Sequence, residues 1–197
     1  MSKLDITLAG ETVSKVTGGD FQNTTFRANS VKNIVHRITC DVTNATYSHG
    51  SIITGGADNN TIYNFGREEN INTSADGKVT NAPIVNSITM FTDLPVTGPV
   101  DIHFWASTTG FGSVGSAPSN SGIVVSKLYN GTVTLDDWKD LGGSPTIKAC
   151  TLSNIGLVID LLASSNQISL QIVNQTGQNV VASGSMKAYV KLGVIND

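Results

Sequence analysis

The C-terminal stretch of the chain, residues 156–197, reads GLVIDLLASSNQISLQIVNQTGQNVVASGSMKAYVKLGVIND. Apolar residues alternate with other residues in three runs, and polar breaks at Ser164–Asn166 and around Gly177 separate these runs. Because successive side chains of a strand point to opposite faces, a period of two is typical of half-buried strands. The stretch therefore predicts three strands, and since short loops join them we expect them to pair as antiparallel neighbours.

The last run divides most clearly into two faces. The residues expected to face a core are Met186, Ala188, Val190, Leu192 and Val194. Lys187, Tyr189 and Lys191 fall on the opposite face. This division indicates a sheet with one buried side and one side in contact with solvent.

Similar patterns occur along most of the chain. The further predicted strands cover residues 34–42, 83–92, 100–106, 123–128 and 145–152. The strands at 83–92 and 100–106 are separated by a turn with Pro95 and Pro99, so we expect them to form a hairpin. In the second of these strands, Asp101, His103 and Trp105 are expected on the outward face.

One segment, Thr134–Leu141, predicts a short helix. Thr134 is a good N-cap, and the acidic pair Asp136 and Asp137 falls in the first turn, where the helix dipole favours carboxylates. The two glycines at 142 and 143 are expected to end this helix.

The fold class that these patterns predict is all-β. About eight strands in 197 residues favour a two-sheet antiparallel sandwich of the jelly-roll type, with one short helix. An immunoglobulin-like sandwich is the alternative, although it normally has fewer strands in about 100 residues. Residues 1–32 lack sustained periodicity and predict an extended N-terminal arm, so the domain organisation is an arm at 1–32 and a β-sandwich at 33–197.

Composition argues against several functions. The net charge is −3 without a block rich in Lys or Arg, so we expect no nucleic-acid partner, and no apolar run is long enough to span a membrane. The chain has three histidines and no Gly-x-Ser-x-Gly motif, so we expect no enzyme activity, no metal and no cofactor. Cys40 and Cys150 fit no zinc motif, and their spacing leaves open whether they form a disulfide.

Aromatic residues are the candidates for an interaction site. The five residues selected are Phe21, Phe26, Tyr63, Trp105 and Tyr189. The first two lie in the predicted arm, and Trp105 and Tyr189 fall on outward strand faces, where they are expected to be available to a partner.

Four segments carry a resemblance to a known family. They are VTNATYSHGSIITGG at 42–56, IVNSITMFTDLPVTGPVDIHFW at 84–105, TLDDWKDLGG at 134–143 and SMKAYVKLGVIND at 185–197. In this order they resemble the jelly-roll capsid decoration, or cement, proteins of tailed bacteriophages. The resemblance covers roughly residues 34–197 and leaves the predicted arm uncovered.

The resemblance implies a location on the outer capsid surface of a virion that is assembled in the cytoplasm of a bacterial host. It implies a homo-oligomer, often a trimer, that locks neighbouring subunits of the major capsid protein together. One alternative is a receptor- or carbohydrate-binding module of a phage tail fibre, with Tyr63, Trp105 and Tyr189 on its binding surface. Another is a coat protein that forms the shell itself, but many of these carry a strongly basic arm, whereas residues 1–32 hold four basic and three acidic residues.

Overall fold

The computed structural model describes residues 6–8, 11–13, 32–54, 61–64, 84–106, 112–119, 122, 128–160 and 167–196. The chain divides into two units, Met1–Val31 with Asp197, and Lys32–Asn196. In the first unit, β1 (Ile6–Leu8) pairs antiparallel with β2 (Glu11–Val13). The second unit holds the sheets described below.

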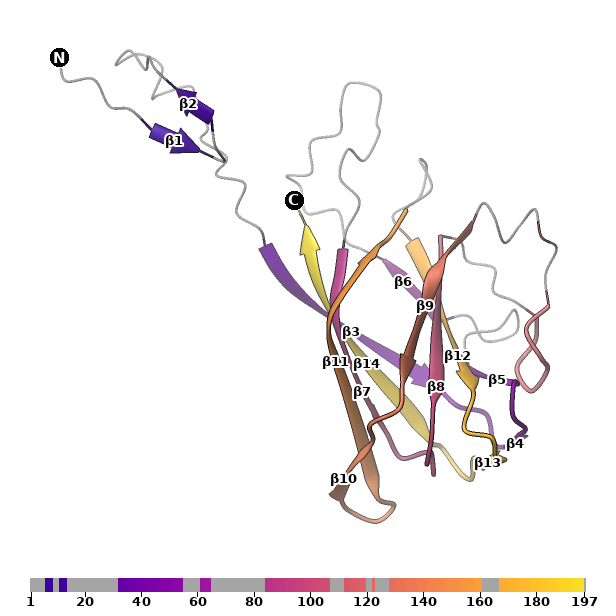
Figure 1. Cartoon of the computed structure of the whole chain (residues 1–197). Coiled ribbons are helices and arrows are strands. Elements are labelled where there is room, and N and C mark those ends of the chain that lie inside the picture. Colours follow the sequence, from indigo (N-terminus) through magenta and orange to yellow (C-terminus); the bar gives the residue numbers. More distant parts are fainter. Residues whose placement is uncertain are drawn as a thin grey trace. The chain divides into compact units, whose positions relative to one another are not determined.

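The first sheet has five antiparallel strands (Figure 1). In spatial order these are β10 (Lys139–Gly142), β11 (Ile147–Val158), β7 (Ile84–Thr92), β14 (Lys187–Asn196) and β3 (Lys32–Asp41). The strand nearest the C-terminus, β14, therefore lies inside the sheet, between the edge strand β3 and the central strand β7.

The second sheet is also antiparallel. Its spatial order is β5 (Ile52–Thr54), β12 (Gln167–Asn174), β8 (Val100–Trp105) and β9 (Tyr129–Leu135). A further strand, β6 (Thr61–Asn64), pairs with β12 along a different stretch from β5. The short strands β4 (Thr46–Tyr47) and β13 (Val180–Val181) pair with each other.

The pairing is nested, which identifies the fold as a jelly roll. The first long strand, β3, pairs with the last, β14; β5 and β6 pair with β12; β7 pairs with β11; and β8 pairs with β9. A chain that folds as one long antiparallel ribbon and then wraps into two sheets gives this order. The immunoglobulin-like alternative is wrong, because there the first strand pairs with the second.

The core lies between the two sheets and uses the predicted inner faces. Ala188, Val190, Leu192 and Val194 of β14 are completely buried, as are Ile168, Leu170 and Ile172 of β12. Each large aliphatic side chain buried in this way contributes about 1.5–3 kcal/mol of hydrophobic free energy. The period-two prediction for these faces is confirmed.

The predicted pairing of sequential strands is wrong. Two of the three C-terminal strands, β11 and β14, lie in the first sheet with β7 between them, whereas β12 lies in the second sheet. The expected hairpin of β7 and β8 is also absent, because these strands belong to different sheets. The physical reason is that the connections of a jelly roll cross from one sheet to the other, so a strand finds its partners far away in sequence.

Strand β11 is longer than predicted. It joins the strand expected at 145–152 to the start of the C-terminal stretch, with a register shift between Ser153 and Leu157. Asn154 and Gly156 have φ values of 60° and 67° at this shift, a left-handed conformation that glycine and asparagine adopt most easily. The strand predicted at 123–128 lies outside the described residues except for Leu128, and β9 has no counterpart among the predictions.

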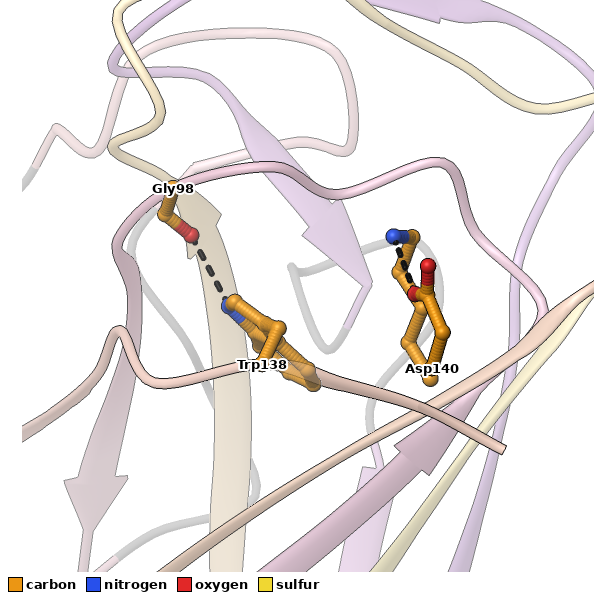
Figure 2. A network of polar contacts seen from close by, with 4 residues as sticks. Gly98, Trp138 and Asp140 are labelled. Carbon is orange, nitrogen blue, oxygen red and sulfur yellow. Dashed lines mark hydrogen bonds and ion pairs between the residues drawn. The ribbon is translucent and has the colours of Figure 1, made fainter. Parts of the chain in front are cut away.

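The helix predicted at Thr134–Leu141 is wrong. Thr134 and Leu135 end β9, and Lys139–Gly142 form β10 on the edge of the first sheet. The indole Nε1 of Trp138 donates a hydrogen bond to the carbonyl oxygen of Gly98 at 2.9 Å, and beside it Lys148 Nζ lies 2.7 Å from Asp140 Oδ1 (Figure 2). An eight-residue helix is marginal by itself, and the pairing of β10 with β11, together with the long-range Trp138–Gly98 hydrogen bond, outweighs its local signals.

The two cysteines do not form a disulfide with each other. Cys40 lies in β3 and Cys150 in β11, and β14 and β7 separate these strands. Three strand spacings correspond to roughly 14 Å, about twice the longest Cα separation that a disulfide bridges.

Candidate interaction surface

The structure separates the five predicted interaction residues. Phe21 and Phe26 lie outside the described residues. Tyr63 is part of β6, where its backbone lies opposite Ile168 of β12. Tyr189 is 48% exposed, whereas Trp105 is completely buried, so the prediction that Trp105 is available to a partner is wrong.

Tyr189 lies on the outer face of the first sheet, and the strand register determines which residues lie beside it. One row across the sheet consists of Thr39, Tyr189, Phe91 and Ala149. The next row consists of Arg37, Lys191, Thr89 and Thr151. The register thus gathers residues from four strands, β3, β14, β7 and β11, on one face.

A hollow of about 350 Å³ lies beside Tyr189 on this face. Its lining residues are Arg37, Ile38, Thr39, Phe91, Tyr189, Val190 and Lys191. The ammonium group of Lys191 lies 4.7 Å from the centroid of the Phe91 ring, a cation–π contact that holds this lysine over the sheet. We call the five outward-phase residues Arg37, Thr39, Phe91, Tyr189 and Lys191 the Tyr189 face.

The charges around the Tyr189 face are mostly positive. Strands β3, β7, β11 and β14 contain a single acidic residue, Asp41, which lies 3.3 Å from the ammonium group of Lys187 at one end of the face. Among the described residues, no carboxylate forms an ion pair with Arg37 or Lys191. The open face therefore combines aromatic surface with two cations.

The outward side of the second sheet is different. His103 Nδ1 lies 2.8 Å from Thr132 Oγ1 and 3.2 Å from the hydroxyl of Tyr129, which also contacts Thr132. The Trp105 ring packs on Tyr129 with centroids 4.9 Å apart. Burial lowers the pKa of His103 below its ordinary value, and the nearby charge of Asp101 opposes this shift.

Trp105 shows why the prediction for it was wrong. Its side chain has the outward phase that the alternation of β8 predicts, since the core cluster contains Val100, Ile102 and Phe104 and not Trp105. It is nevertheless covered, as are its neighbours on β12, Ser169 and Gln171. The alternation along a strand predicts on which face of the sheet a side chain lies, but not whether other parts of the chain cover that side chain.

Within the described part of the chain, no group of three or more His, Cys, Asp or Glu side chains is placed to hold a metal ion. The same residues include no helix that is long and apolar enough to span a membrane. The absence of enzyme activity stays a prediction.

Fold and site together define a jelly-roll protein with an open aromatic and basic sheet face. No protein-family model and no curated protein matches the sequence. Among solved structures, the chain is similar to one described as "Israeli acute paralysis virus heated to 63 degree - full particle", with 10% identity and a TM-score of 0.31 over 100% of this chain and 83% of that chain. The jelly-roll assignment rests on the strand order and not on this likeness, and the resemblance to phage decoration proteins stays a prediction.

Proposed function

We propose that the protein is a structural component of a virion, a decoration protein that binds the outside of a phage head and links neighbouring major capsid subunits. The observation that carries the proposal is the open Tyr189 face. Tyrosine, phenylalanine and arginine are enriched at protein interfaces, and tyrosine and arginine are common among the residues that dominate binding energy. The capsid is proposed as the partner because four segments of the sequence resemble phage decoration proteins.

The fold suits this role because it presents the face on a rigid support. A protein that binds only the assembled shell stabilises it by mass action, by about 2.7 kcal/mol per site at a concentration of 100 times Kd. A homotrimer multiplies this effect, because after the first contact its other sites bind at a high effective concentration. The proposed location is the outer capsid surface, and the proposed partners are the major capsid protein and further copies of this chain, with neither nucleic acid nor membrane.

The test uses shells of the virus that encodes the chain, prepared without this protein. Light scattering gives the mass of the purified protein, and sedimentation measures whether it binds the shells. We expect cosedimentation and a raised temperature of shell disruption. Binding to host cells or glycans without binding to shells would favour the tail-fibre alternative, and spontaneous assembly of this chain into shells would favour the coat-protein alternative.

A further inference from the structure

We infer that the Tyr189 face is the docking site for an acidic polypeptide segment of the capsid partner. The inference rests on the proposed function and adds the location of the contact and the chemistry of the partner. Its evidence is the charge distribution, the aromatic surface and the hollow on the outer face of the first sheet.

The charge distribution favours an acidic partner. Four strands, β3, β7, β11 and β14, contain five Lys and Arg residues and one acidic residue, in a chain whose net charge is −3. Two of these cations have carboxylate partners, Lys187 with Asp41 at 3.3 Å and Lys148 with Asp140 at 2.7 Å. Of the other three, Lys32 begins β3, whereas Arg37 and Lys191 lie on the Tyr189 face, directly opposite each other in the register of β3 and β14.

The size and lining of the hollow indicate which side chains the partner's docking segment carries. A volume of about 350 Å³ is at the lower end of the range for ligand sites and accommodates one large side chain. Phe91 and Tyr189 form its apolar walls, while Arg37 and Lys191 supply donors at its rim. The matching segment therefore carries an apolar side chain for the hollow and carboxylates beside it, one of which accepts paired hydrogen bonds from the Arg37 guanidinium.

A polypeptide fits this surface better than a sugar. The residues of the Tyr189 face spread over three strands, β3, β14 and β7, about 10 Å across, which is wider than one sugar ring needs. Arginine, tyrosine and phenylalanine on one sheet face also match the composition of protein interfaces. A glycan and a second copy of this chain are therefore the outcomes that would contradict the inference.

The first experiment measures shell binding by full-length variants with single charge reversals. Arg37→Glu and Lys191→Glu are expected to weaken binding by at least about tenfold, because each leaves like charges facing each other. Thr46→Glu is the control, since Thr46 is exposed in β4, which belongs to a different sheet, and does not line the hollow. Its binding is expected to equal that of the wild type, and circular dichroism checks that every variant is folded.

The second experiment identifies the partner group. A carbodiimide joins the ammonium group of Lys191 to a carboxylate in direct contact, with loss of water to the reagent, and mass spectrometry locates the new amide. We expect a cross-link to an Asp or Glu of the shell protein, and weaker shell binding as salt rises. A cross-link to another copy of this chain, or loss of shell binding on adding sialyllactose, would overturn the inference.

The two proposals fail in different ways. If wild-type protein does not bind the shells, the proposed function is wrong. If wild-type protein binds and both Arg37→Glu and Lys191→Glu bind equally well, the decoration role stands and the docking site at the Tyr189 face is wrong.

Discussion

Tyr189 of β14 and Trp105 of β8 both have the outward phase of their strands, in two different sheets, yet only Tyr189 reaches solvent. Tyr189 is 48% exposed and borders an open hollow, whereas Trp105 is buried against Tyr129. The two outer faces thus differ: the first sheet offers aromatic surface and cations, whereas the second sheet buries Trp105, Ser169 and Gln171 and exposes threonines of β9. We infer that substitutions on the first face affect binding, whereas those on the second affect stability.

The strongest test of this comparison is a pair of alanine substitutions. Trp105→Ala is expected to lower the free energy of unfolding by about 3–5 kcal/mol, because it removes a large buried ring and leaves a cavity. Tyr189→Ala is expected to change it by no more than about 1 kcal/mol, the value of an exposed cross-strand pair with Phe91. Urea unfolding followed by circular dichroism measures both.

The same two variants separate the faces in the binding assay. Tyr189→Ala is expected to weaken shell binding although the protein remains folded. Equal losses of stability for both variants would show that the two faces do not differ in the way proposed.

The sequence predicted the inner faces of the strands well, because burial on one side of a sheet imposes a period of two. The inward residues of β12 and β14 illustrate this. The pairing of strands could not be predicted in the same way, since β3 and β14 are partners although most of the chain lies between them. The helix at Thr134–Leu141 failed for a related reason, because Trp138 is held by Gly98, which lies far away in the sequence.

The candidate site was predicted only in part. Tyr189 was found from its phase, but Arg37 and Phe91 join it solely through the register of three strands. Once that register is known, the outward neighbours of Tyr189 follow directly. The cover over Trp105 has no signal in the alternation of β8, because alternation describes one strand and not what packs on it.

A second, smaller contrast involves polar side chains. Asn174 of β12 is completely buried, and its Nδ2 donates hydrogen bonds to the carbonyl oxygens of Tyr47 at 2.9 Å and Gln178 at 2.8 Å. Asn174→Ala leaves these buried acceptors without their donor, so we expect a loss of about 1–3 kcal/mol. Thr39→Ala on the Tyr189 face is the control, because an exposed threonine is expected to change stability by no more than about 0.5 kcal/mol. Equal urea midpoints for the two variants would contradict this expectation.

The smallest expected effect is a dependence of the free energy of unfolding on pH, which arises from His103 on the outer face of the second sheet. Burial lowers the pKa of His103 in the folded protein, with the Asp101 charge acting in the opposite direction. The unfolded chain, with an ordinary histidine pKa of about 6.5, therefore binds a proton at a higher pH than the folded protein does. Stability from this difference is complete above about pH 6.5 and decreases as the pH falls below that value.

Two measurements check this effect. NMR titration of the histidine ring protons is expected to show His103 titrating below the ordinary histidine range. Urea midpoints between about pH 7.5 and pH 5.5 are expected to fall less steeply in His103→Gln than in the wild type, because glutamine keeps a polar group beside Tyr129 and Thr132 but binds no proton. If the two proteins lose stability in parallel over this range, His103 does not contribute to the pH dependence. The outer face of the second sheet then stabilises the fold through packing and hydrogen bonds that do not depend on a titrating group.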